Sequence, residues 1–328
     1  MSTKQTDIES IDFLKLIGSI MIFIMHLGVF GSVWSYFSRW AVPFFFIVSS
    51  FFYFSKSEKN YKKYVARIVS LYVCWLLINL PSIFYYKIYC VGGLYQINTW
   101  LNFIKNILLS STFTGSWYLL ASIWGIGIIQ FLSKKLSTWL CLLVVFPIQL
   151  ICISSSLYFG LLPLNIANVF DYLLFPLNIF GGIFYIAVGK IIAEKRTSIK
   201  SIPFVYLIAA GVFLLVSIAE NVFVKENNWF KMSDCSFSII GAAIFLVLFC
   251  LTINLTIKKS RELRKISTII FCGQGNIILS SGFVTHRLLN TDSFIILFFV
   301  AIVMMSLLIV LILYIQKRST LGFAKYLT

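Results

Sequence analysis

The two histidines of the chain are its clearest candidates for chemistry, and one of them shares a helix with a lysine. His26 lies in an apolar stretch, eleven residues after Lys15. At about 100° per residue, this spacing puts both side chains within about 20° of one helix face and about 16 Å apart along the axis. Burying an imidazole in hydrocarbon costs free energy, so we expect a partner or a reaction to require it. A neutral imidazole can act as a general base or as a transient acyl carrier.

The helix that must position these groups carries a polar stripe. Asp12, Lys15, Ser19 and His26 follow one another at spacings of three, four and seven residues. Such a stripe on an otherwise apolar helix faces protein or water. A purely structural interpretation is also open: Lys15 reaches the cytoplasmic surface and pairs with Asp12, while His26 only hydrogen-bonds a neighbouring helix.

The composition of the remaining chain requires a membrane. The sequence is 60% hydrophobic and only 12% charged, and its mean hydropathy is +0.94. We predict an all-α, polytopic bundle that forms a single membrane domain over residues 1–328. Apolar runs long enough to cross about 30 Å of hydrocarbon predict about ten helices. The predicted spans are 11–31, 40–55, 66–86, 116–133, 137–155, 172–193, 203–224, 236–257, 267–286 and 293–316.

The basic residues predict the orientation of these spans. If the N-terminus is cytoplasmic, most of the 27 Lys and Arg residues fall in cytoplasmic loops, and so does the C-terminus. Seven basic residues do not fall on the cytoplasmic side. Lys15 lies within a span, and the six on the outer side are Arg39, Lys87, Lys105, Lys225, Lys231 and Arg287. The net charge of +16 is spread over short loop clusters at one membrane face. This pattern favours anionic lipid, and not nucleic acid, as the partner of these charges.

The outer side carries further features of interest. The longest predicted polar loops, 87–103 and 225–235, both lie there, and Arg39 and Trp40 suit the outer interface. The seven cysteines follow no metal-binding spacing, so we expect no metal. Cys90 and Cys235 both fall in predicted outer segments, where a disulfide between them or two free thiols are the alternatives.

Five segments of the chain resemble the acyltransferase 3 family of bacterial membrane proteins. In family terms, the first is an acidic residue, then a basic residue, ten further residues and a His. The second is an Arg before V-P-F-F-F, and the third is a basic run into the third span. The fourth is a Trp followed by an aromatic residue, and the fifth is a closing His. They correspond to Asp12 to His26, Arg39 to Ser49, Lys62 to Val69, Gly115 to Ala121 and Ser280 to His286. The chain departs from the family at Ser50, where Gly is usual, and at Ser70, where Pro is common. Lys63 also stands four residues before Arg67, where an Arg-x-x-Arg pair is usual.

The resemblance implies an enzyme that moves an acyl group, typically acetyl from cytosolic acetyl-CoA, to a hydroxyl of an extracytoplasmic glycan or envelope precursor. It also implies ten helices with both termini inside and a place in the bacterial cytoplasmic membrane. Catalytic roles are expected for His26 and Lys15; acyl-CoA binding for Lys63, Arg67 and Lys15; and substrate binding for Arg39, Trp117 and His286. Trp117 and His286 have simpler interpretations as membrane-interface residues.

Two functions of other classes stay open. The same fold forms the membrane portion of vancomycin-resistance serine racemases, which is linked to L-serine uptake, and the segment from Arg39 to Ser49 resembles that branch too. In such a transporter, His26 and the cations would recognise a carboxylate or couple protons. The lack of a racemase domain disfavours this alternative, although a chain continuing beyond Thr328 would look the same. The other alternative is a glycan exporter or an accessory subunit that catalyses no reaction.

Overall fold

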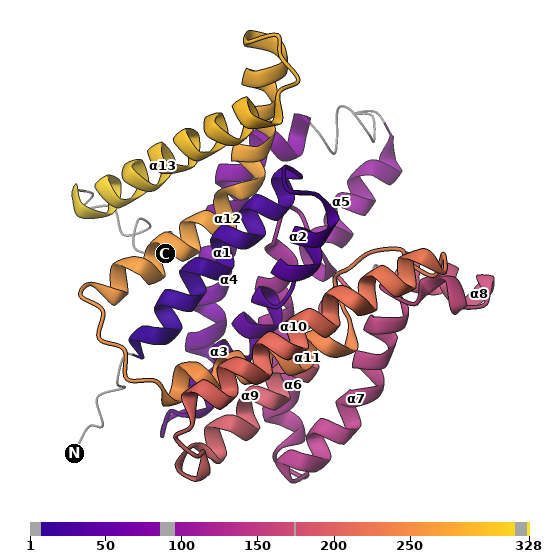
Figure 1. The fold of residues 1–328 in the computed structure, drawn as a ribbon, viewed down its shortest axis with the longest axis vertical. Coiled ribbons are helices and arrows are strands. Elements are labelled where there is room, and N and C mark those ends of the chain that lie inside the picture. Colours follow the sequence, from indigo (N-terminus) through magenta and orange to yellow (C-terminus); the bar gives the residue numbers. More distant parts are fainter. Residues whose placement is uncertain (1–7, 86–95, 174, 319–326) are drawn as a thin grey trace.

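The protein is all-helical in the computed structural model, which describes residues 8–85, 96–173, 175–318 and 327–328 (Figure 1). No strand occurs within these ranges. The helices are α1 (Glu9–Leu27), α2 (Gly31–Ser38), α3 (Ala41–Phe54), α4 (Tyr61–Ile83), α5 (Ile97–Leu109), α6 (Ser116–Leu132), α7 (Thr138–Ser154), α8 (Leu164–Tyr172), α9 (Ile183–Glu194), α10 (Pro203–Glu226), α11 (Phe237–Thr252), α12 (Ser260–Phe283) and α13 (Phe294–Arg318). Short 3₁₀ segments cover Phe159–Leu161 and Arg196–Ser198, and a π-helical turn covers Val284–Leu288.

Each of the ten predicted spans overlaps one of these helices. Six stretches within the described residues are long and apolar enough to cross a bilayer. They are Glu9–Leu27, Gly31–Phe54, Tyr61–Ile83, Pro203–Glu226, Ser260–Leu288 and Phe294–Arg318. The shorter apolar helices α6, α7 and α11 accompany them. The polytopic helical bundle is thereby confirmed, whereas the count of ten and the side on which each terminus lies stay predictions.

Two segments differ from the prediction for local reasons. The span predicted over 172–193 is helical only from Ile183, because Pro176 lacks an N–H and Asn178 holds a series of turns. Asn178 donates to the carbonyl of Leu173 at 2.8 Å and accepts from the N–H of Phe180 at 2.9 Å. The loop predicted over 87–103 was wrong from Ile97 onwards, where α5 begins. Its apolar residues recur every three to four positions, which is the period of a helix.

The core of the bundle surrounds α3, most of whose side chains are buried. Helix α9 lies against α3 so closely that a Cβ added to Gly189 would stand 1.9 Å from the Oγ of Ser50. Trp40 is 3% exposed and packs edge-on against Phe44, and its predicted place at the outer interface stays a prediction. At the edge of the bundle, α13 packs along α12 and leaves most of its surface uncovered (Figure 1).

Helix α1 lies between α3 and α12 and is fixed by small polar contacts. The hydroxyl groups of Ser19 and Ser267 lie 2.8 Å apart, and the Oγ of Ser10 donates to the carbonyl of Cys250 at 2.6 Å. Hydrogen bonds of this kind join helices where hydrophobic burial discriminates poorly between neighbours. Of the polar stripe of α1, Asp12 and Ser19 are buried against protein, Lys15 is half-buried, and His26 is exposed.

Candidate active site

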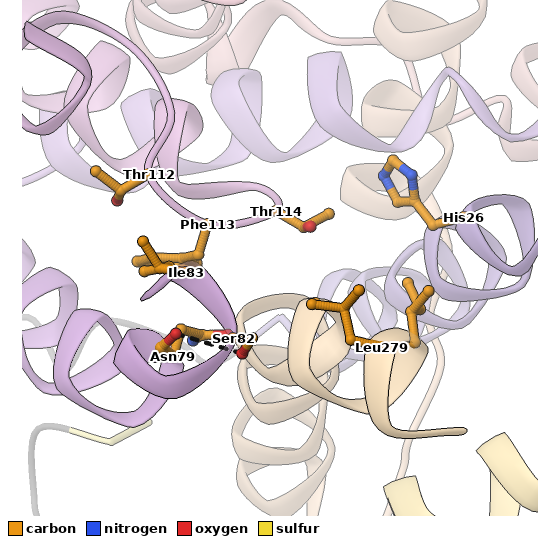
Figure 2. A pocket seen from close by; sticks show the side chains of 10 residues that line it. His26, Asn79, Ser82, Ile83, Thr112, Phe113, Thr114 and Leu279 are labelled. Atoms are coloured by element: carbon orange, nitrogen blue, oxygen red, sulfur yellow. Dashed lines mark hydrogen bonds between the residues drawn. The ribbon is translucent and has the colours of Figure 1, made fainter. Parts of the chain in front are cut away.

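His26 occupies the end of α1 and borders a cavity. The helix ends two residues later at Gly28, whose φ of 72° is readily adopted by a residue without a Cβ. The imidazole is accessible from a cavity of about 250 Å³ and makes no hydrogen bond to any described residue (Figure 2). The other lining residues are Asn79, Ser82 and Ile83 of α4; Thr112, Phe113 and Thr114; and Gly275, Ile278 and Leu279 of α12.

Two asparagines fix α4 against α12 at this cavity, in a reciprocal arrangement. The amide of Asn79 donates to the carbonyl of Cys272 in α12 at 3.3 Å, and the amide of Asn276 donates to the carbonyl of Ile78 in α4 at 3.0 Å. The Oδ1 of Asn276 also accepts from the hydroxyl of Ser82. These bonds set the separation of the two helices that form one side of the site.

The opposite wall comes from the turn that leads into α6. The Oγ of Ser116 accepts from the backbone N–H groups of Thr112 at 2.9 Å and Phe113 at 3.2 Å. Gly115 has a φ of 87°, and a Cβ there would stand 3.0 Å from the ring of Phe271. The turn therefore needs a glycine and holds the side chains of Phe113 and Thr114 at the cavity.

Charged groups lie close to His26 without lining its cavity. Arg39 forms an ion pair with Asp234, and its Nε donates to the Oγ of Ser233 at 3.1 Å. Both charges are near enough to interact electrostatically with the imidazole. Arg39, predicted to bind substrate, thus lies near His26 with its charge compensated. Asp234 was not anticipated, because nothing in the sequence of its loop distinguishes it from an ordinary solvated carboxylate.

The other end of α1 carries a second group of charges. Lys15 is half-buried and interacts electrostatically with Asp12, Arg264 and Arg67. The carboxylate of Asp12 is held by Arg264 through two hydrogen bonds of 2.8 and 2.7 Å. Asp12 therefore has Arg264, and not Lys15, as its ion-pair partner, which makes the alternative pairing wrong. Arg67 is near enough to Lys15 to interact electrostatically with it, whereas Lys15 does not line the cavity of His26.

The remaining predicted site residues lie elsewhere. Lys63 is exposed on the first turn of α4, one turn before Arg67. Trp117 packs its ring on Phe46 with centroids 5.6 Å apart, outside the cavity lining. His286 lies in the π-helical turn after α12, is exposed, and pairs with Asp292 at 2.8 Å. Neither side chain reaches the cavity of His26.

Sequence reasoning missed the polar residues that face His26. Asn79, Ser82 and Thr114 stand in or beside apolar helices, where such residues most often join helices. The described ranges contain no cluster of His, Cys, Asp or Glu that could hold a metal ion. Cys235 is buried with a free thiol, while Cys90, its suggested disulfide partner, lies outside the described residues.

Comparison with known proteins gives two findings. Residues 8–315 match the family described as acyltransferase domain. A protein of Enterococcus faecalis named amino-acid racemase is 29% identical over 198 residues, which are 56% of this chain and 27% of that protein. The chain thus spans about a quarter of the length of this curated relative. No solved structure matches the chain. Since the family match extends over nearly its whole length, the chain belongs to the acyltransferase 3 family of membrane acyltransferases.

Proposed function

We propose that this protein transfers an acyl group, and specifically acetyl, from cytosolic acyl-CoA to a hydroxyl of an extracytoplasmic glycan or cell-envelope precursor. The membrane is the bacterial cytoplasmic membrane. The observation that carries the proposal is the imidazole of His26, which borders a cavity without a hydrogen bond to any described residue. A histidine that served only to join helices would have its ring nitrogens bonded to a neighbour.

The size of the cavity suits the reacting groups. About 250 Å³ is less than the roughly 300–1,000 Å³ of sites that enclose a drug-sized molecule. The space accommodates a small acyl group and the hydroxyl-bearing part of an acceptor, and not a whole CoA. The nucleotide of CoA must therefore bind elsewhere and present its thioester on the flexible pantetheine arm.

The inner end of α1 offers a place for that nucleotide. Lys15, Arg67 and Arg264 gather there, and Lys63 lies one turn away from Arg67 on the same helix. Guanidinium groups bind phosphate oxygens in pairs, and an ammonium group adds a point charge. The eleven residues from Lys15 to His26 correspond to about 16 Å of helix, so a flexible arm can connect the two places.

The chemical step needs one base at the cavity. The neutral imidazole of His26 takes the proton of the acceptor hydroxyl while that oxygen forms a bond to the thioester carbon. The carbon–sulfur bond then breaks, and the CoA thiolate leaves and takes up a proton. In the overall reaction, this proton balances the one that the hydroxyl released. Acetyl-imidazole at His26 is the two-step variant of this transfer, in which the ring nitrogen first displaces CoA.

The two histidines provide a matched test. We would reconstitute the protein in lipid vesicles and measure CoA release from labelled acetyl-CoA, together with label transferred to added acceptor. His26→Gln should lower the rate at least about 100-fold, the usual contribution of a general base. His286→Gln should leave the rate within about twofold, because His286 lies away from the cavity. Equal rates for wild type and His26→Gln contradict the proposal.

A transporter is the second candidate, because the relative from Enterococcus faecalis is named an amino-acid racemase. Uptake of labelled L-serine into the same vesicles, without any release of CoA from acetyl-CoA, would favour this alternative. In that case the unpaired imidazole would take part in binding a carboxylate or in coupling protons.

A further inference from the structure

Asn79 has an unusual combination of burial, fixed orientation and an unused acceptor. The residue is 1% exposed, and its amide nitrogen donates to the carbonyls of Trp75 at 2.7 Å and Cys272 at 3.3 Å. Because both partners are acceptors, they fix which end of the side chain is nitrogen. No described residue donates a hydrogen bond to the Oδ1 atom. Asn79 nevertheless lines the cavity of His26.

The Oδ1 of Asn79 has no donor among the described residues, and the residue lines the cavity. A bound molecule with an O–H or N–H group therefore gains a hydrogen bond by meeting this oxygen. Asn276 is the useful contrast, because its amide makes the reciprocal helix contact while its Oδ1 is already occupied by the hydroxyl of Ser82. Of this pair, only Asn79 has a side-chain oxygen with no donor among the described residues.

The remaining cavity wall defines what kind of molecule fits. Apart from His26, the lining side chains carry no charge. Phe113 supplies an apolar ring, and the hydroxyl of Thr114 has no partner among the described residues. Asn79 and His26 stand on opposite sides of the space (Figure 2). An uncharged wall with one aromatic ring and separate polar groups suits the face and the hydroxyls of a neutral sugar.

We propose that Asn79 is a substrate-binding residue whose Oδ1 accepts a hydrogen bond from a second hydroxyl of the acceptor, while His26 takes the proton of the first. The acceptor is then a neutral molecule with at least two hydroxyls, held at two points across the cavity. This inference rests on the proposed function and adds to it the selectivity for the acceptor.

The test compares two leucine variants of similar shape. Asn79→Leu and Asn276→Leu each remove an amide that joins α4 to α12, but only the first removes the free acceptor. Both would be assayed in vesicles with acetyl-CoA and methyl glycosides of glucose, galactose, mannose and N-acetylglucosamine. Each accepted glycoside would be compared with analogues that lack one hydroxyl at a time. Thermal unfolding reports whether each variant is folded, and Asn79→Ser, which can donate back to the i−4 carbonyl, replaces the leucine variant if needed.

We expect wild type to disfavour one deoxy analogue about tenfold or more, as sites built to bind a hydroxyl do. Asn79→Leu should raise the KM for the parent glycoside by a similar factor and lose that discrimination. Asn276→Leu should keep the discrimination.

Three results overturn the inference. Asn79→Leu that still rejects the analogue shows that another residue binds the hydroxyl. If Asn79→Leu raises only the KM for acetyl-CoA, the group that donates a hydrogen bond to Asn79 is the amide of the pantetheine arm. Turnover of acetyl-CoA with no glycoside accepted shows that the acceptor is not a neutral sugar. If wild type releases no CoA at all, the proposed acyltransferase function itself is wrong. This result distinguishes a failure of the proposed function from a failure of the inference about Asn79.

Discussion

Arg264 of α12 holds Asp12 of α1 through two hydrogen bonds, and only Asp12 is fully removed from solvent. The side chain of Asp12 is 1% exposed, whereas that of Arg264 is 38% exposed. A buried carboxylate is stabilised only while its partner is present. The ion pair therefore fixes the N-terminal end of α1. The fold tolerates the buried carboxylate of Asp12 only while Arg264 is present.

Arg264→Leu should lower the melting temperature in detergent strongly, because it leaves a buried carboxylate without its guanidinium. Uncompensated buried charges cost about 3–5 kcal/mol, and the partial exposure of Arg264 places the expected loss at or below the lower end of that range. The double variant Asp12→Asn, Arg264→Leu should recover part of the loss. A double variant less stable than Arg264→Leu would contradict this account.

The close contact between α3 and α9 predicts that Gly189 cannot be replaced by a residue with a Cβ. Gly189→Ala would place a Cβ 1.9 Å from the Oγ of Ser50 and 2.3 Å from the carbonyl oxygen of Ile47. Backbone cannot yield as a flexible side chain can, so we expect a loss of at least about 1–3 kcal/mol or of folded protein altogether. Gly211→Ala is the control, since a Cβ there meets nothing within 4 Å. Size-exclusion profiles and melting temperatures distinguish the two.

The contact of Glu220 with Tyr158 predicts that this tyrosine titrates at high pH. It accepts from the backbone N–H groups of Phe237 and Ser238 at the start of α11, both at 3.1 Å, and from the hydroxyl of Tyr158 at 3.0 Å. Burial, followed by the charge and hydrogen bond of Glu220, raises the pKa of Tyr158 to about 12. Glu220→Gln should lower that pKa and also the melting temperature, because the charge at the helix N-terminus is lost.

The tyrosinate absorbance measures this pKa. The chain has 16 tyrosines, so the signal of Tyr158 must be taken as the difference from Tyr158→Phe. Because the pKa is higher in the folded state, this contribution to stability is complete below pH of about 10 and is lost as the pH rises to about 12. An unchanged pKa in Glu220→Gln would show that burial acts alone.

Cys235 should be unreactive in the folded protein. Burial raises the pKa of the Cys235 thiol well above its ordinary value, so little thiolate forms at mildly alkaline pH. Alkylation by iodoacetamide at pH 8.5 should therefore be slow until the protein is unfolded. Mass spectrometry of the peptide containing Cys235 checks this, and rapid labelling of folded protein would contradict it.

Apolar runs predicted most of the helices, because the membrane imposes this pattern directly on the sequence. The prediction failed where local chemistry interrupted a run, at Pro176 and Asn178. It also failed from Ile97 onwards, where the amphipathic helix α5 takes the place of a predicted loop. His26 and Lys15 could be selected because charged and titratable groups are rare in apolar helices. Their position on one helix face is likewise a property of the sequence.

The partners of these groups could not be predicted in the same way. Arg264 lies 252 residues from Asp12, and its basic neighbours made it look like one member of a loop cluster. Asn79 is one of several asparagines in apolar helices, and its free acceptor depends on the positions of Trp75 and Cys272. Such roles follow from tertiary contacts that no local pattern records.

The position of His26 at one end of α1 and of the cations at the other has an electrical consequence. Under the proposed function, the polyanionic donor stays at the inner surface and only an uncharged acyl group travels along the length of the helix. No ion crosses with it, so the ion gradients and potential of the cell are left intact while the cell surface is modified.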